Sequence, residues 1–495
     1  MTKHRRSRRE FMGIAGAGIA SLVGAPWLGA APAAQAQGAG LRPQDADLVV
    51  FNAKVYTVDS RAPRAEAFAV KAGRFSAVGT GAEIRALTGK GTQTFDARQM
   101  TVVPGFIDCH NHAPGNVLLY EVLVGNPYEV EFVTISSIVE KLRAKALKTP
   151  PATWVEGFFF DDTTVKDNRQ LNIHDLDQVS TDLPVAVHHR GGHTSFYNSK
   201  AFELANITKD TPNPPGGTFD RDSSGSLNGR VTDLARAALD KVGKRPTFTE
   251  EQTMQRDRDA LAYISKQFVR YGVTTVHHEG GNLAALQQVR ARGELLHRVS
   301  YEASGKVLDA MIASGIERAQ RLFPRADARP KITHCTLIND DLIRRIKAGG
   351  VVPAAFTSYA YYNSDKFVFY GEELMKRCMA YRSFLDAGIP VAAGSDFSPG
   401  PFDPRMAIQG MVTRTGWDGK TWGANQRITV EEALRVNTLN GAYNSHEEAI
   451  KGSITPGKLA DFVVLSDDPF TMDQAKIKDL QIVRTVVAGS PVYHA

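Results

Sequence analysis

Apolar residues near both ends of the chain occur in short runs separated by turn residues. The runs are rich in β-branched and aromatic residues, as strands are, and they cover residues 47–59, 68–70, 75–78, 460–465 and 482–488. Ala72 with Gly73, and the cluster 452–457, supply turns beside them. We therefore expect one small β-sandwich assembled from two distant segments, 46–101 and 446–495.

Between residues 102 and 445, short apolar runs alternate with amphipathic helical stretches. The apolar runs cover 102–103, 185–187, 273–276, 331–333, 351–352 and 391–393, and helical periodicity covers 250–271 and 340–348. This alternation predicts an α/β fold with a parallel sheet, and at this size a (β/α) barrel. An open doubly wound sheet is the alternative. No strand opens into a Gly-x-Gly-x-x-Gly turn, so dinucleotide binding has no support.

The first 36 residues have the pattern of an export signal. A basic stretch precedes an apolar run over 11–27, and Ala-Gln-Ala at 34–36 offers a cleavage site. The run is too short and too rich in Gly and Ala for a membrane span. Ser-Arg-Arg-Glu-Phe-Met at 7–12 resembles a twin-arginine signal, which implies export of a folded protein to the periplasm. A disordered basic tail is the alternative.

Composition and charge exclude some classes of protein. The 495 residues are 42% hydrophobic and 23% charged, which is ordinary for a globular enzyme. The chain carries a net charge of +6, but its first 36 residues hold five Lys and Arg against Glu10 and so account for +4 of it. The remainder leaves no basic footprint for nucleic acid. Three cysteines, Cys109, Cys335 and Cys378, cannot form a disulfide framework.

The most informative stretch is 102–112, which ends in His110-Asn-His112. In a strand, residues two apart share a face, so His110 and His112 point the same way. Two imidazoles that converge at a strand end are suited to a divalent metal. A pair of structural histidines is the alternative.

Two later strands end in further metal donors. The run 331–334 ends in His334, and the run 391–396 ends in Asp396. In parallel barrels the active site gathers at the carboxyl ends of the strands, so three histidines and one carboxylate could meet there. Asp396 could also accept a proton from metal-activated water. A helix cap or turn is its alternative role, because Phe-Ser-Pro-Gly follows.

These motifs resemble the amidohydrolase superfamily. The matching segments are Pro-Gly-Phe-Ile-Asp-x-His-x-His at 104–112, Thr-His-Cys at 333–335 and Gly-Ser-Asp at 394–396. Segments that resemble its type-3 branch are 192–193, 198–201, 210–217, 272–277 and 457–461, so the resemblance runs from about residue 46 to the end. It implies a metal-bearing (β/α) barrel over 102–445 with a β-sandwich from both termini. It also implies hydrolysis of amide, formamide or cyclic amide C–N bonds in a small-molecule substrate.

The same resemblance implies roles for single residues. His110, His112 and His334 would be metal ligands, with zinc as the metal, and Asp396 would be both a ligand and the proton shuttle. His193 is the best candidate for a substrate contact among the polar residues after 185–187. His277 is another candidate, although only one of His277 and His278 can face the barrel interior. Tyr361 and Tyr362 could form an aromatic wall or pack in the core.

The chain departs from the family pattern in one region. Family members carry a Lys or Glu on the fourth barrel strand and a His on the fifth, and we find neither. The interval 282–330 holds one helix, a strand at 298–302 and a helix at 307–323, which is less than two βα units of roughly 30 residues each. Glu302 could stand in for the missing bridging carboxylate or contact substrate, and Lys306 lies nearby.

The alternative for this region is a deletion, which would leave an incomplete barrel with unpaired strand edges. Three histidines and Asp396 would then hold one zinc ion and not two. The sequence therefore offers two functions: a metal-dependent hydrolase, or a catalytically impaired homologue. Oligomerisation is left open by the sequence.

Overall fold

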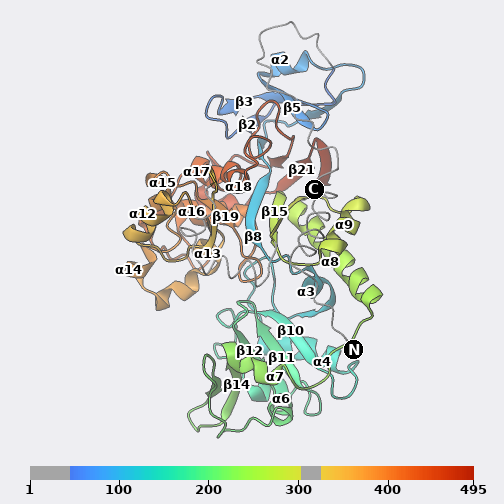
Figure 1. Cartoon of the computed structure of the whole chain (residues 1–495), viewed down its shortest axis with the longest axis vertical. Helices are drawn as coiled ribbons and strands as arrows, with labels where there is room; N and C mark the ends of the chain where they lie inside the picture. The colour runs from blue at the N-terminus through green and yellow to red at the C-terminus, as the bar shows by residue number, and fades with distance from the viewer. Residues whose placement is uncertain (1–44, 303–324) are drawn as a thin grey trace, which may run out of the picture. The chain divides into compact units, whose positions relative to one another are not determined.

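A computed structural model describes residues 45–302 and 325–495 of the chain. Two sheets pack as a β-sandwich, one with the strand order β5-β4-β1-β6 and one with the order β22-β21-β20-β7-β2-β3 (Figure 1). The strands are β1 (Leu48–Phe51), β2 (Lys54–Tyr56), β3 (Arg64–Ala65), β4 (Ala67–Lys71), β5 (Arg74–Gly79), β6 (Gln93–Asp96), β7 (Thr101–Pro104), β20 (Phe462–Leu465), β21 (Ile482–Val487) and β22 (Ser490–His494). Phe68 packs edge-on against Phe75 at 5.2 Å and Phe462 at 4.9 Å between ring centroids. Both ends of the described chain therefore share one apolar core.

Six parallel strands form the centre of the fold. They are β8 (Phe106–Asn111), β15 (Val273–Glu279), β16 (Arg298–Glu302), β17 (Lys331–His334), β18 (Val352–Phe356) and β19 (Ala392–Gly394). Parallel pairing gives two three-stranded sheets, β16-β15-β8 and β17-β18-β19. The sheets meet where the amide of Asp396 donates to the carbonyl of His110 at 2.8 Å and the amide of His112 donates to that of Phe397 at 3.3 Å. The strand order is thus β16-β15-β8-β19-β18-β17.

Helices connect and cover these strands. They are α2 (Gly81–Arg85), α3 (Gly115–Tyr120), α8 (Glu250–Arg270), α9 (Leu283–Ala291), α12 (Asp340–Ala348), α13 (Tyr359–Tyr362), α14 (Glu372–Met375), α15 (Tyr381–Asp386), α16 (Pro404–Thr413), α17 (Val430–Val436) and α18 (Leu439–Asn444). The longest, α8, begins with a capping box between Thr249 and Gln252 and buries Ile264 and Phe268. Over 45–302 and 325–495, no helix combines the length and the apolar character that crossing a membrane requires.

The array of parallel strands has a gap between β16 and β17. Over the described ranges no backbone pairing joins these two strands. Instead the Lys331 ammonium contacts the Glu302 carboxylate and donates to the carbonyl of Cys109 at 2.9 Å. The predicted α/β class is confirmed, whereas the described strands do not close a barrel. Lys306 and the helix predicted at 307–323 lie outside the described residues.

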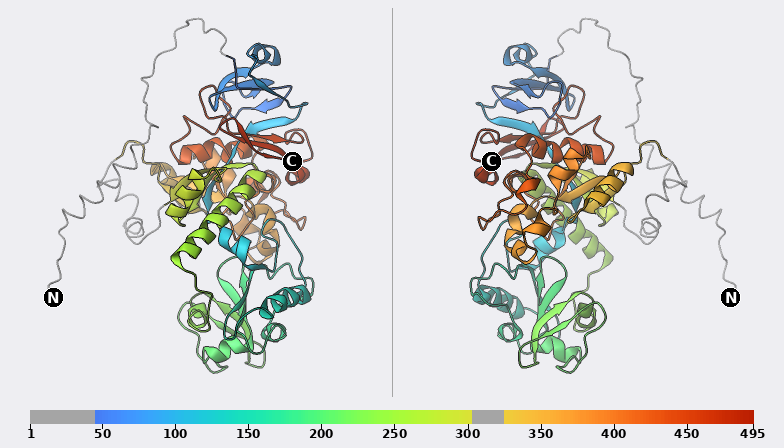
Figure 2. Two further views of the ribbon diagram at one scale, coloured as in Figure 1. Left: turned by 90° about the vertical axis from the view of Figure 1, so that its right-hand side faces the viewer. Right: turned by 90° about the vertical axis from the view of Figure 1, so that its left-hand side faces the viewer.

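A separate mixed sheet lies between β8 and α8 in the chain, with the order β13-β14-β12-β11-β10-β9 (Figure 2). Its strands and helices are β9 (Val122–Leu123), β10 (Val155–Phe160), β11 (Val185–His189), β12 (Thr194–Tyr197), β13 (Phe219–Arg221), β14 (Leu227–Thr232), α4 (Ile135–Ala146), α5 (Ile173–Asp177), α6 (Ser199–Leu204) and α7 (Arg236–Leu239). The apolar run 185–187, expected in the barrel, belongs here because β11 pairs with β10 and β12. The run 102–103 lies in the β-sandwich as part of β7.

Candidate metal centre

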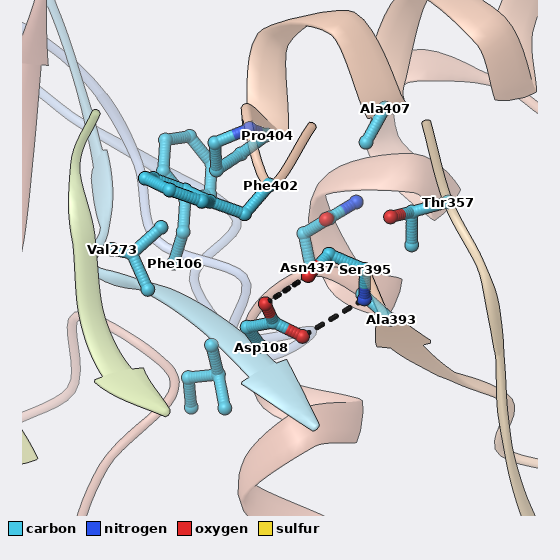
Figure 3. Close-up of a pocket in the computed structure, with 11 residues that line it drawn as sticks. Phe106, Asp108, Val273, Thr357, Ala393, Ser395, Phe402, Pro404, Ala407 and Asn437 are labelled. Carbon is cyan, nitrogen blue, oxygen red and sulfur yellow. Dashed lines mark hydrogen bonds between the residues drawn. The ribbon is translucent and has the colours of Figure 1, made fainter. Parts of the chain in front are cut away.

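The end of β8 is fixed by a buried carboxylate. Asp108 accepts hydrogen bonds from the Ser395 amide at 2.9 Å, the Ser395 hydroxyl at 2.6 Å and the His110 amide at 3.2 Å (Figure 3). The Asn111 side chain donates a fourth at 2.9 Å. A buried carboxylate with several donors is a rigid junction. It ties β8 to the chain just after β19, where Asp396 stands.

Four of the predicted site residues meet at this junction. His110 Nε2 lies 3.0 Å from His334 Nε2 and 3.2 Å from Asp396 Oδ1. His334 Nε2 lies 3.5 Å from Asp396 Oδ2, and His112 Nε2 lies 2.9 Å from Asp396 Oδ1. His110 and Asp396 are buried, whereas the side chains of His112 and His334 are each 47% exposed. Donors from three strand ends therefore converge on one point that solvent can reach.

The spacing of these atoms fits a metal ion. Ligand atoms of a tetrahedral zinc ion, each 2.0–2.1 Å from the metal, stand about 3.3 Å apart. His110 Nε2 stands 3.0 Å from His334 Nε2 and 3.2 Å from Asp396 Oδ1, and Asp396 Oδ2 stands 3.5 Å from His334 Nε2. One ligand atom from each of the three residues lies within 4.8 Å of the others. Imidazole nitrogen and carboxylate oxygen are both usual zinc ligands. Two imidazole Nε2 atoms that face each other can share only one proton, so a shared cation satisfies them better.

Backbone strain marks the same residues. His334 has a φ of +67° and Asp396 a φ of +50°, in the left-handed region that side chains other than glycine seldom adopt. Each such residue costs on the order of 1–3 kcal/mol and persists only where surrounding structure enforces it. Two of the three converging donors thus have this conformation, which also occurs at other residues of the described chain.

The electrostatics favour an ionised Asp396. Burial alone would raise the pKa of this carboxyl, but hydrogen bonds from His110, His112 and His334 outweigh burial and hold its pKa well below the usual range. The pKa of His112 is raised, chiefly by its hydrogen bond to Asp396. Asp396 is thus ionised among the imidazoles before substrate binds, as a metal ligand must be.

Glu279, the last residue of β15, also reaches this centre and was missed in the sequence. Its Oε2 lies 3.1 Å from His110 Nδ1 and 3.9 Å from His112 Nδ1. A carboxylate behind a ligand histidine orients the ring and raises its basicity. Its position at the end of a predicted strand, as with His334 and Asp396, was the signal that could have identified it.

A cavity of about 900 Å³ opens over the centre, with Asp396 and His334 in its lining. This size falls within the range of small-molecule sites. Its polar lining residues include Asp162, His189, Arg190, His193 and Lys366. Its apolar lining residues include Leu337, Phe356, Tyr359, Phe367, Phe369, Tyr370 and Met375.

The three predicted substrate contacts have different positions. His193 lines this cavity, with Nδ1 2.8 Å from Asp233 Oδ1. His277 and Glu302 are not in its lining. His277 Nδ1 lies 3.5 Å from Glu302 Oε1, and burial, followed by the charge of Lys331, lowers the pKa of His277 well below its ordinary value. Glu302 also forms an ion pair with Lys331. Neither His277 nor Glu302 therefore contacts the cavity.

Other polar residues have structural roles. The Arg190 guanidinium donates to the carbonyls of Ser398 and Pro399, at 3.1 and 3.0 Å, and contacts the Tyr362 hydroxyl. Tyr361 and Tyr362 pack in a buried cluster with Met406. Asp161, Asp162 and His189 form a second group with metal-ligand spacing, but Lys366 Nζ already lies 2.9 Å from Asp161 Oδ2.

Comparisons with known proteins agree with this picture. Residues 93–315 and 305–493 match the sequence profile of the Amidohydrolase family. The chain is 25% identical to an N-substituted formamide deformylase of Arthrobacter pascens, over 90% of this chain and 97% of that protein. It is 23% identical to the putative amidohydrolase YtcJ of Bacillus subtilis, over 89% and 98% of the two chains.

One solved structure and one alignment add detail. An uncharacterized metal-dependent hydrolase from Pyrococcus horikoshii has a similar fold, with a TM-score of 0.62, 18% identity, and coverage of 86% of this chain and 99% of that one. The alignment with the deformylase runs over 539 positions but contains only 90% of the 495 residues of this chain. At roughly 90 positions of the alignment the deformylase therefore has a residue and this chain has a gap.

Proposed function

Because this chain belongs to the amidohydrolase family, we propose that it is a metal-dependent hydrolase of small molecules that cleaves a non-peptide C–N bond. The bond would be that of an amide, a formamide or a cyclic amide. The observation that carries the proposal is the convergence of His110, His334 and Asp396 within 3.0–3.5 Å at the floor of a cavity. His112 Nε2 lies against the same carboxylate.

His110, His112, His334 and Asp396 are the residues that would hold the metal, and zinc suits this donor set. When bound, the metal supplies Lewis-acid activation of the substrate carbonyl and of the attacking water. Glu279 orients His110 through Nδ1. Two groups with metal-ligand spacing meet at this centre, His110 with His334 and Asp396 and His110 with His112 and Glu279. Because His110 is common to both, we propose a single metal ion.

Asp396 moves the proton in this mechanism. Its Oδ1 lies 3.2 Å from His110 Nε2 and 2.9 Å from His112 Nε2, whereas its Oδ2 lies 3.5 Å from His334 Nε2. Oδ2 is therefore the freer atom to accept a proton from water as the water adds to the carbonyl carbon. The same oxygen then returns the proton to the leaving nitrogen, so that the amine departs neutral.

N-substituted formamides are the first substrates to test, because a relative with this name covers most of the chain. The zinc-loaded protein is incubated with N-benzylformamide, N-butylformamide or N-acetylbenzylamine. The amount of amine released measures hydrolysis. Turnover of any of them that disappears on chelation and returns with zinc supports the proposal. Metal-independent turnover contradicts it.

A catalytically impaired homologue is the second candidate, and it is favoured because no strand of residues 45–302 and 325–495 pairs with the outer edge of β16 or of β17. We further propose that the roughly 90 alignment positions absent from this chain include the family's fourth and fifth barrel strands. An impaired homologue would bind metal weakly and turn over none of the amides. A zinc-replete protein that hydrolyses an amide rules it out.

Residues 1–36 carry the remaining proposal, export through the twin-arginine route to the periplasm. These residues lie outside the described ranges, so the proposal rests on the sequence alone. A fusion of residues 1–36 to a reporter that is active only after export in a folded state tests it. Replacing Arg8 and Arg9 by Lys should block export, and undiminished export in that variant contradicts the proposal.

A further inference from the structure

Tyr359 is held rigidly beside the candidate metal centre. It is the first residue of α13, three positions after the last residue of β18. Its ring stacks on Phe356 at 4.0 Å with an interplanar angle of 9°, and Phe356 stacks on His334 at 4.7 Å and 16°. Two consecutive stacks thus fix the Tyr359 ring relative to a proposed metal ligand. A group fixed before substrate binds needs no reorganisation during the reaction.

The Tyr359 hydroxyl is free to bind a ligand. Tyr359 lines the same cavity as Asp396 and His334. Tyr359 is partly exposed, and its hydroxyl makes no hydrogen bond to any residue of the described ranges. The fully buried Tyr381, by contrast, donates to the carbonyl of Ala355 at 3.2 Å. Tyr359 therefore keeps a donor available at the cavity that it lines.

Three of the charged side chains that line the cavity are already engaged. Arg190 donates to backbone carbonyls of Ser398 and Pro399. Lys366 Nζ is bound to Asp161 and to Asn363, at 2.9 and 3.2 Å. His189 Nε2 lies 3.4 Å from Asp162, and its Nδ1 accepts from the Gly191 amide at 3.0 Å. Each of these three side chains would lose an existing partner if it turned to a substrate. The Tyr359 hydroxyl would lose none.

We propose that Tyr359 is a catalytic residue whose hydroxyl donates a hydrogen bond to the carbonyl oxygen of the substrate as that oxygen becomes an oxyanion. This inference rests on the proposed function. No bond within Tyr359 breaks in this step. Water adds to the carbonyl carbon, its proton goes to Asp396, the C=O π electrons move to the oxygen, and the Tyr359 proton stays on Tyr359. A phenol is protonated at neutral pH, so the donor is always present.

The test compares a tetrahedral anion with a planar amide. Zinc-loaded wild type and Tyr359→Phe are titrated with N-benzyl methylphosphonamidate, and their KM and kcat are measured with N-benzylformamide. Phenylalanine keeps the stack on Phe356 and removes only the donor. We expect the variant to bind the phosphonamidate about 10- to 100-fold more weakly and to lose a similar factor in kcat, with KM within about threefold.

Tyr361→Phe is the matched control, because it makes the same change in the same helix on a ring that packs with Tyr362 and Met406. It should leave binding and turnover unchanged. Zinc content and thermal unfolding are measured on every variant. A second variant, Gly400→Ala, retains the hydroxyl but places a methyl group 3.0 Å from Tyr359 Cε2 and 2.9 Å from Ser358 Oγ. It should displace the ring and weaken phosphonamidate binding without loss of zinc.

The outcomes separate the two claims. If wild type hydrolyses the amide and Tyr359→Phe binds the phosphonamidate as tightly as wild type does, the role of Tyr359 is overturned and the proposed function stands. If zinc-loaded wild type hydrolyses none of the amides, both are overturned.

Discussion

The amide of Asp396 donates a 2.8 Å hydrogen bond to the carbonyl of His110. Asp396 follows β19, and His110 is the second-last residue of β8. This bond therefore joins the two three-stranded sheets at the point where the proposed metal would lie. It holds the Asp396 carboxylate 3.2 Å from His110 Nε2. The metal centre is therefore built at a sheet junction, and substitutions there should separate chemistry from stability.

Asp396→Asn tests the proton shuttle. The amide has the shape of the carboxylate but is a far weaker base, so we expect kcat to fall by about 10²- to 10⁴-fold with little change in the midpoint of thermal unfolding. Steady-state hydrolysis of a formamide and differential scanning fluorimetry measure the two effects. Asp341→Asn, at an exposed position of α12, is the control. Full activity in Asp396→Asn would remove Asp396 from the mechanism.

Ser395→Ala tests the buried carboxylate beside the site. Asp108 would lose the 2.6 Å bond from the Ser395 hydroxyl and keep the one from the Ser395 amide. Burial raises the pKa of Asp108, and a buried carboxyl that loses one donor costs about 1–3 kcal/mol. The free energy of unfolding should therefore fall by that amount in urea titrations. An unchanged free energy of unfolding would show that the Asp108 junction contributes no stability.

Lys331→Met tests the contact across the gap between β16 and β17. Lys331 lies in β17, and Glu302 lies in β16. Removal of the Lys331 ammonium leaves the Glu302 carboxylate without this cationic partner. Removing one member of a largely buried pair is more damaging than removing both. We expect the single variant to lose about 2–3 kcal/mol of unfolding free energy and the double variant with Glu302→Gln to recover part of it. Additive losses in the double-mutant cycle would show that the two residues do not interact.

A buried pair of histidines should make stability depend on pH. His278 Nε2 lies 3.0 Å from His297 Nε2, under α8. Burial lowers the pKa of His278 to about 4 and, together with the charge of His278, holds the pKa of His297 well below its ordinary value. Because the folded-state pKa values lie below the unfolded value of about 6.5, the neutral rings stabilise the fold fully above that pH.

That contribution is lost as the pH falls from about 6.5 to about 4. We expect the free energy of unfolding to decrease by about 2 kcal/mol per histidine between pH 7.5 and pH 5. In His297→Gln, urea titrations at both pH values should show a decrease about 2 kcal/mol smaller than in wild type. Equal decreases in the two proteins would show that His297 does not titrate with folding.

The sequence predicted the strand ends of the site better than the sheets that hold them. His110, His334 and Asp396 each follow a short apolar run. β8 and β19 are buried on both faces, as such runs usually are, whereas β17 is only partly buried. The runs 102–103 and 185–187 have the same appearance, yet β7 pairs with β20 and β11 with β12. Pairing partners depend on contacts between distant segments, which an apolar run does not encode.

The sequence also could not predict which side chains contact one another in the site. Tyr359 stands in a run with Tyr361 and Tyr362, and only the stack through Phe356 to His334 distinguishes it. His277 and His278 are neighbours, but His278 faces His297 whereas His277 faces Glu302. Alternation along a strand separates the two faces and does not say which face meets which partner.

Zinc binding by the purified protein tests the central claim most directly. Metal-free protein is titrated with zinc in a calorimeter, and bound metal is measured after dialysis, for wild type and for His334→Ala. We predict close to one equivalent of zinc in wild type and an affinity at least about tenfold lower in the variant. Less than about one-tenth of an equivalent in wild type, after zinc has been supplied, would contradict the account.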